Sequence, residues 1–535
     1  MNGSAKRLTA IIMVTAMIAS AMVIVLTDEQ DSSADEPTAS NYYYNQLDMK
    51  FSKAVYDAVK GKYTAGSYED LAFTITVDPS EISIFESKES GPDKDEYFVS
   101  KQINKGIIAA VYDNPLIGFY ISTTNPAGSI THEGGYTSIS FTVNKISAYS
   151  SAMSTYKTEM TDKINEIVTP ISSATTSSKV TSLHDTVAGT LSYDKEHASS
   201  SDPTGSIIRS AYTALCGDHK VVCEGYAKMF KVLCDAVDVP CLIVTGKAGT
   251  DGTFENHMWN YVEVDGLWYL IDCTWDDQQD NPMGTIVNDY LMAGWATEGF
   301  DSVKIVDSHL ATGLDTGFVV DKSLSYYKYG SPGTQYTVTF LYDPELEPTK
   351  VYRTQYVGEG ATAVIPEDPA DRVGRHFWGW YLHGTDTEYT FNDPVNSDLT
   401  IDGKWTSVEV YTLRYDTCGG TNVQATRVEV TDNVTKITDI EPKKEGYKFI
   451  EWNTSKDGKG VSYKAGDEIT LVGDATLYAV WEDTSSVSYK IDNLLGKAAE
   501  FLSKETIPGV SNLLLTIGVI TTVISLLAVA AIARK

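Results

Sequence analysis

Apolar and polar residues in the first part of the chain follow two different periods. At 50–63 (KFSKAVYDAVKGKY) the apolar residues recur at a helical spacing, whereas at 136–143 (YTSISFTV) they alternate with polar residues, as in a strand. Another helical stretch, with Ser-rich interruptions, runs from about 151 to 193. We therefore expect a mixed α/β region over residues 42–180 and a second domain over 181–330.

The segment that starts at Cys223 has the pattern of a helix whose body is buried. Tyr226, Phe230 and Leu233 recur at a helical spacing, so Cys223 lies at or near the N-terminus of this helix. Unpaired amides and the helix dipole stabilise an anion there, and a thiol in such a place shifts toward thiolate at neutral pH. This position suits a nucleophile, whereas Cys234, which lies inside the apolar stripe, suits the core.

Two apolar-rich stretches flank an Asp-Gly pair at 265–266, which predicts a β-hairpin with a two-residue turn. With that turn Trp259 opposes Asp272, and His257 lies two residues before Trp259 on the same face. His257 and Asp272 are therefore diagonal neighbours, about 7 Å apart at their backbones and within reach of each other's side chains. A thiolate nucleophile needs a base and an orienting group, and these two residues supply both.

Each of these residues also has a structural alternative. A lone cysteine is usually structural, and Cys216, His219 and Cys223 have the short spacing of metal ligands. A structural zinc site usually needs two such pairs and the second is missing, so we expect neither a metal nor another cofactor. Disulfides stay open in an oxidising compartment for four cysteines: Cys216, Cys234, Cys241 and Cys273. Cys223 must stay outside them if it is the nucleophile.

The motifs CEGYA at Cys223, NHMWNYV around His257 and IDCTWDD around Asp272 resemble the transglutaminase-like superfamily, in the order Cys, His, Asp. The upstream LHDTVAGTLSYD is similar to the same family, and the close match covers about 180–280. The resemblance implies a papain-like α+β core. It also implies Cys223 as acyl-accepting nucleophile, His257 as general base and then acid, and Asp272 as orienting group. The Cys223 amide is one expected oxyanion donor, and the second donor stays open.

The chain then repeats itself with an offset of about 72 to 76 residues. The first copy contains YTVTFLYD and RHFWGWYLHG, and the corresponding segments of the second copy are YTLRYD and YKFIEWN. Alternating apolar residues, Gly-rich turns and the lack of a helical period predict two small β units, over 336–406 and 411–482. They resemble the Listeria–Bacteroides surface repeat of the internalin B kind. That resemblance implies either a stalk or contacts with the cell envelope and other surface proteins.

Both ends of the chain are apolar. Residues 1–27 carry two basic residues before a long hydrophobic run, which predicts a secretory signal or an uncleaved anchor, with an acidic, Ser-rich linker at 28–41. Residues 512–533 are long and apolar enough for a transmembrane helix after a linker at 483–511. Arg534 and its neighbour then place the C-terminus inside, so the rest lies outside the cell.

The net charge of −30 argues against nucleic acid and anionic lipid as partners. We expect an α+β protein with a papain-like core, an N-terminal mixed region, two β repeats and a C-terminal membrane helix. Its function would be attack on a protein or peptide amide at the cell surface, with a thioester intermediate. Release to water gives a peptidase or amidase, which we favour slightly, and release to an amine gives a cross-linker. The alternative is a non-catalytic surface adhesin.

Overall fold

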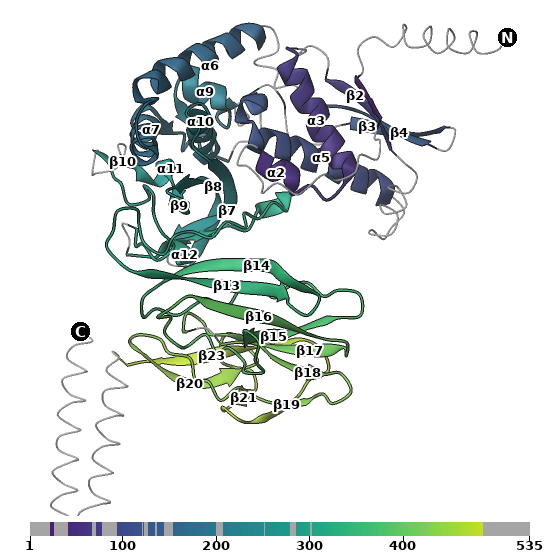
Figure 1. The fold of residues 1–535 in the computed structure, drawn as a ribbon, viewed down its shortest axis with the longest axis vertical. Coiled ribbons are helices and arrows are strands. Elements are labelled where there is room, and N and C mark those ends of the chain that lie inside the picture. The colour runs from purple at the N-terminus through teal and green to yellow at the C-terminus, as the bar shows by residue number, and fades with distance from the viewer. Residues whose placement is uncertain are drawn as a thin grey trace, which may run out of the picture. The chain divides into compact units, whose positions relative to one another are not determined.

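The chain forms two compact units, Met1–Gly333 and Thr334–Lys535. The computed structural model (Figure 1) describes residues 22–25, 41–66, 71–77, 94–119, 121, 127–133, 136–143, 153–199, 207–250, 252–278, 285–299, 302–421 and 423–484. The predicted membrane helix at 512–533 and most of the predicted signal segment at 1–27 lie outside these residues. Among the helices that the structure describes, none has the length and apolar character needed to cross a bilayer.

The N-terminal part of the first unit mixes helices and strands, and the helix and strand expected at 50–63 and 136–143 are confirmed. Its helices are α2 (Tyr42–Asn45), α3 (Lys50–Thr64), α5 (Lys94–Asp113) and the 3-10 helix η2 (Pro115–Phe119). Its sheet has the order β1-β2-β4-β3, with β1 (Met22–Val25), β2 (Ala72–Val77), β3 (Ala127–Glu133) and β4 (Tyr136–Thr142).

The rest of the first unit places helices against an antiparallel sheet of order β12-β7-β8-β9. The strands are β7 (Cys241–Thr250), β8 (Thr253–Val264), β9 (Leu267–Ile271) and β12 (His309–Leu310). The longer helices are α6 (Met153–Val168), α7 (Thr176–Thr190), α9 (Ala211–Cys216) and α10 (Cys223–Asp235), and Figure 1 shows them on one side of β7 and β8. The short elements are η4 (Thr169–Ile171), β5 (Ser192–Tyr193), β6 (Lys220–Val221), α11 (Cys273–Asp276), β10 (Asp277–Gln278), β11 (Thr285–Ile286), α12 (Ile305–Ser308) and η5 (Leu314–Thr316).

The predicted hairpin is confirmed, because β8 and β9 pair with Val264 opposite Leu267. Asp265 and Gly266 have φ values of 53° and 80°. Positive φ at both central residues is what a two-residue turn of this kind requires, and it explains the Asp-Gly pair. The register therefore runs as expected up to the end of β9, and Asp272 follows directly.

One hydrophobic core extends through the described part of the first unit. A single cluster of buried side chains extends from Tyr42 to Leu324, so the N-terminal helices and the central sheet bury their apolar surface together. The Tyr43 hydroxyl, which is buried, donates a hydrogen bond to the Ile243 carbonyl in β7. The N-terminal region thereby supports the sheet that carries His257.

The second unit is built from strands alone in its described part, as expected for the repeats. Their sheets have the orders β14-β13-β16-β15 and β18-β17-β23-β20-β21. In the first repeat the strands are β13 (Gln335–Asp343), β14 (Glu347–Gly358), β15 (His376–Leu382) and β16 (Leu399–Thr406). In the second they are β17 (Val410–Asp416), β18 (Thr426–Glu429), β19 (Val434–Lys436), β20 (Tyr447–Asn453), β21 (Ser462–Tyr463), β22 (Glu468–Thr470) and β23 (Ala475–Asp483).

The repeated aromatic residues form the same core in both copies. Trp380 and Trp452 are completely buried. Each contacts the phenylalanine three residues earlier, with ring centroids 4.9 Å apart in the first repeat and 5.2 Å apart in the second. The closing tryptophans each donate an indole hydrogen bond to a backbone carbonyl of their own repeat. For Trp405 this carbonyl lies near the end of the first strand, and for Trp481 it lies just after it. The sequence period therefore reflects a repeated packing unit.

Candidate active site

Cys223 is the first residue of α10, as the apolar spacing predicts. The preceding Val222 is extended and no side chain caps the helix in the described part of the chain. Gly225 in the first turn allows α10 to pack directly on β6, because a Cβ there would lie 2.5 Å from the Cβ of Val221. The half-buried Cys223 thus stands where backbone amides and the helix dipole favour negative charge.

Asn260 sets the distance between α10 and the strand that carries the histidine. Its buried side-chain amide donates to the carbonyl of Ala227 in α10 at 3.1 Å and to that of Leu242 in β7 at 3.2 Å. Asn260 lies in β8 only three residues after His257. The bond to Ala227 therefore holds the helix of Cys223 against the strand of His257, and the bond to Leu242 joins that strand to β7.

His257 joins the other two predicted residues. Its Nε2 lies 2.7 Å from Oδ2 of Asp272, which leaves Nδ1 as the ring nitrogen available to a thiol, and the ring also interacts with the Cys223 side chain. Burial lowers the pKa of His257, but the Asp272 carboxylate and Cys223 outweigh burial and raise it to about 10. The ring is therefore an imidazolium at neutral pH. The structure brings all three predicted residues together.

Asp272 is buried and accepts four hydrogen bonds. Its Oδ1 caps α11 by accepting from the backbone amides of Thr274 at 2.9 Å and Trp275 at 3.1 Å. Its Oδ2 accepts from His257 and, at 3.1 Å, from Nε2 of His309. Burial raises the pKa of Asp272, but the two histidines hold it far below its usual range. A carboxylate with every lone-pair direction occupied is strongly fixed in orientation.

His309 is a member of this cluster that the sequence patterns did not predict. It lies in β12, which has two residues, and its ring is buried against Trp259, Trp275 and Tyr290 with centroids 4.6–5.3 Å apart. Burial lowers the pKa of His309, so the ring is neutral at neutral pH. A strand this short has no periodicity, so no pattern in the sequence could have assigned it to the site.

His257, Asp272 and His309 each offer one atom within 4.8 Å of the others, a spacing that suits metal ligands. Hydrogen bonds from two imidazoles to one carboxylate account for this geometry, since both Nε2 atoms lie 2.7–3.1 Å from the same oxygen. The earlier metal candidate, His219, has its Nδ1 against the Ala214 carbonyl at 2.9 Å. We keep the prediction that activity needs no metal.

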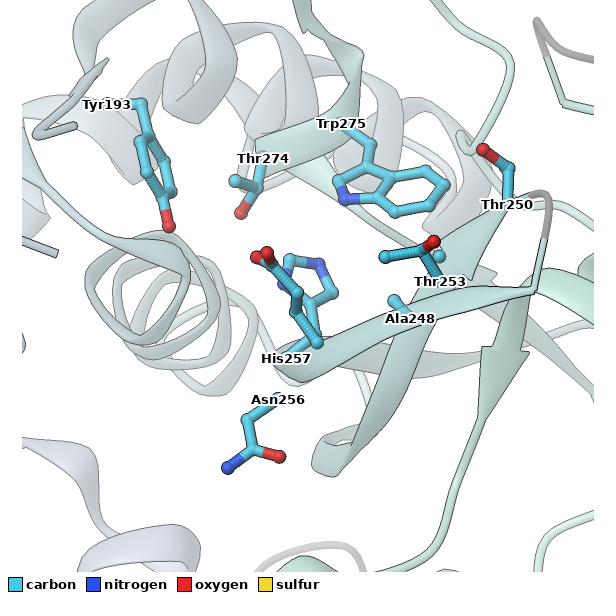
Figure 2. A pocket seen from close by; sticks show the side chains of 10 residues that line it. Tyr193, Ala248, Thr250, Thr253, Asn256, His257, Thr274 and Trp275 are labelled. Atoms are coloured by element: carbon cyan, nitrogen blue, oxygen red, sulfur yellow. The ribbon is translucent and has the colours of Figure 1, made fainter. Parts of the chain in front are cut away.

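A pocket of about 400 Å³ opens beside His257. Figure 2 shows Tyr193 and Thr274 on one side of the His257 ring and Trp275 on the other. Tyr193 interacts electrostatically with Cys223, and burial, followed by the charges around it, raises its pKa to about 12. Its hydroxyl is therefore a neutral hydrogen-bond donor at neutral pH, and Figure 2 shows it pointing into the pocket.

The six cysteines are all free thiols, so Cys223 is not bridged. None of the disulfides considered for the other cysteines is formed in this structure. Cys234, Cys241 and Cys273 are buried, whereas Cys216 and Cys418 are partly exposed. Burial raises the pKa of Cys216 to about 11, which makes it a poor nucleophile and a suitable control for Cys223.

The ion pair between His257 and Asp272 predicts a pH-dependent stability. The folded-state pKa of His257 is raised from 6.5 to about 10, so its contribution is complete below pH 6.5 and is lost as the pH rises toward 10. The melting temperature of wild type minus that of His257→Gln should therefore decrease between these two pH values. Thermal melts from pH 6 to 10 test this, and a constant difference would contradict the ion pair.

Parts of this chain are similar to proteins of known sequence. A protein of Evansella cellulosilytica with the provisional name Gly-rich membrane protein is 27% identical over 204 residues, which is 36% of this chain and 22% of that protein. Kyphoscoliosis peptidase of Mus musculus is 32% identical over 96 residues, 16% of this chain and 14% of that protein. The chain therefore spans less than a quarter of the length of either relative.

A crystal structure described as a TGase is 16% identical to this chain, with a TM-score of 0.20, over 38% of this chain and 51% of its own. The Transglutaminase-like superfamily matches residues 163–273, and the Listeria-Bacteroides repeat domain matches 336–403 and 411–480. The order expected from the motifs is confirmed: the chain contains a transglutaminase-like domain followed by two Listeria-Bacteroides repeats.

Proposed function

We propose that the protein is a thiol enzyme that attacks amide bonds of proteins or peptides at the cell surface. The observation that carries the proposal is the contact of His257 with both Cys223 and Asp272 beside an open pocket. Nucleophile, base and orienting group are thereby in reach of one another and of a substrate. The match to the transglutaminase-like superfamily supports the same chemistry.

In the acylation step the Cys223 thiolate attacks the carbonyl carbon of the substrate amide. The oxyanion that forms is stabilised by the Cys223 backbone amide and by the Tyr193 hydroxyl. The His257 imidazolium then gives its Nδ1 proton to the leaving nitrogen as the carbon–nitrogen bond breaks. The product amine departs and the acyl group stays on Cys223 as a thioester.

In the deacylation step His257, now neutral, takes a proton from the incoming water or amine. The new nucleophile attacks the thioester, the carbon–sulfur bond breaks, and the thiolate–imidazolium pair is restored. Asp272 holds the ring in the tautomer that both steps need. Hydrolysis is favoured over transfer because the polar pocket, with Thr250, Thr253 and Glu255 in its wall, admits water at high concentration.

The cell surface is the proposed location. The provisional name of the Evansella relative is that of a membrane protein, and surface repeats follow the enzyme domain. Residues 1–27 would direct export, and residues 512–533 would anchor the chain in the membrane. The repeats would hold the enzyme domain away from the membrane or contact other surface proteins.

Hydrolysis and transfer predict different products from one assay. The full chain is incubated with casein in the presence and absence of a fluorescent primary amine. We expect new casein fragments and little fluorescence on casein, because water competes for the thioester. Fluorescent casein without fragments would overturn the preference for hydrolysis and would assign the chain as an amine transferase. Cys223→Ala, which lacks the thiol, is the control for both products.

A further inference from the structure

We propose that His309 is a positioning residue of the triad, which acts by holding the Asp272 carboxylate in the orientation that His257 requires. The inference rests on the proposed function. Its starting point is that two imidazole nitrogens share one oxygen: Nε2 of His257 at 2.7 Å and Nε2 of His309 at 3.1 Å from Oδ2 of Asp272.

The strand register directs His309 to the face of the sheet that carries His257. His257 in β8 is opposite Gly246 in β7, and His309 in β12 is opposite Ala248, two residues further along β7. Residues two apart on a strand lie on the same face, so both histidines do as well. Gly246 allows the backbone after His309 to approach β7 closely, since a Cβ there would lie 1.9 Å from the Leu310 carbonyl oxygen.

The tautomer of His309 follows from its two partners. Oδ2 of Asp272 only accepts, so Nε2 of His309 donates to it, and Nδ1 of the neutral ring accepts from the Ser308 hydroxyl at 2.9 Å. The hydrogen-bonded series Ser308–His309–Asp272 resembles a second triad that shares the Asp272 carboxylate. Ser308 and His309 are both buried, however, so neither reaches a substrate. These two residues can therefore affect catalysis only by their effect on Asp272.

The effect on Asp272 is geometric. Two backbone amides at the start of α11 fix Oδ1, and the second imidazole restrains Oδ2 on the side away from His257. Without His309 one buried lone pair of Oδ2 loses its donor, and the carboxylate is free to turn toward another partner. His257 would then spend less time with Nδ1 directed at Cys223. Because His309 contacts no substrate, the rate constant should fall while the apparent affinity stays unchanged.

The test uses p-nitrophenyl acetate, which reports the thiol chemistry without knowledge of the natural substrate. Cys223 attacks the acetyl carbonyl, the carbon–oxygen bond breaks and p-nitrophenolate leaves; water then releases acetate from the thioester. In the full chain, His309→Phe should lower kcat roughly 10-fold to 100-fold with KM unchanged. His309→Gln should recover most of the rate, since its amide N–H donates from nearly the same place as Nε2.

The chain offers a matched control in His184. Its Nε2 lies 2.9 Å from Oδ2 of Asp276, and both side chains are completely buried, but this carboxylate does not contact His257. His184→Phe should lower the melting temperature by about as much as His309→Phe and leave kcat per folded molecule unchanged. If His309→Phe does not fold, Ser308→Ala is used in its place. This variant removes the hydroxyl that donates to Nδ1 of His309, so the tautomer of the ring is less strongly fixed. It should lower kcat by a smaller factor.

Two results would overturn the inference. One is a kcat for His309→Phe equal to that of His184→Phe at equal folded fraction; the other is an equal loss in His309→Gln and His309→Phe. Failure of the proposed function has a different signature, in which wild type releases p-nitrophenolate no faster than Cys223→Ala. In that case the role of His309 in catalysis is refuted as well.

Discussion

Replacement of Cys223 by alanine is expected to lower the turnover of p-nitrophenyl acetate and the cleavage of casein by on the order of 10³-fold or more. The Cys223 sulfur is the atom that becomes acylated, and the described residues that line the pocket include no second thiol. The thioester intermediate should disappear with it. Mass spectrometry of the chain after brief exposure to the ester detects the acetyl group on the peptide that contains Cys223 in wild type alone.

The matched control for this variant is Cys216→Ala. Cys216 is also partly exposed and ends α9 in the same unit, but its pKa is raised to about 11, chiefly by burial. We expect this variant to keep full turnover. Unchanged activity in Cys223→Ala, or equal acetylation of both cysteines, would refute the enzyme and favour the non-catalytic adhesin, in which the domain is only a scaffold on the repeats.

Asp272→Asn is the second change with a large expected effect, a loss in kcat of about 10³-fold to 10⁴-fold. The carboxylate accepts four hydrogen bonds, two from imidazoles and two from backbone amides. An asparagine amide offers an acceptor on one side only, and its NH₂ group would face donors on the other. His257 would then turn or adopt the wrong tautomer, and the proton transfers of both steps would slow. Stopped-flow measurement of p-nitrophenolate release separates acylation from deacylation.

The same substitution should reduce the free energy of unfolding by about 3 kcal/mol, because the buried imidazolium of His257 loses its counter-charge. Asp276→Asn is the control. Its carboxylate lies in the short helix that Asp272 caps and accepts from His184 and from the Tyr290 amide, but it does not contact His257. We expect it to lower stability and leave kcat per folded molecule nearly unchanged. Equal losses of kcat in both variants would mean that Asp272 acts only through the fold.

Local patterns in the sequence predicted the helix start at Cys223 and the relation of His257 to Asp272. The period of the apolar residues placed Cys223 at the first turn of a helix, and α10 begins there. The Asp-Gly turn fixed the register of the hairpin, and the register alone put His257 and Asp272 on one face as diagonal neighbours. Both inferences hold because they depend on contacts within about 20 residues, where the spacing of residues determines direction.

These local patterns could not predict contacts between side chains that are far apart in the sequence. The approach of Cys223 to His257 depends on Asn260, whose side chain joins β8 to α10 and β7. Tyr193 and His309 reach the site from two-residue strands, β5 and β12, which show no periodicity of their own. His309 is 37 residues from its partner Asp272. A contact across that separation is decided by how the chain packs on the edge of the sheet.

The amino-acid sequence by itself determined the order of the parts, the helix start at the thiol, the hairpin and the repeated β units. The tertiary structure alone decided which side chains surround the carboxylate, and it added a second histidine to Asp272 and a phenol to the pocket. The physical reason is that backbone periodicity acts over one element at a time. Convergence of side chains requires the burial of a common core, and in this protein that core extends from Tyr42 to Leu324.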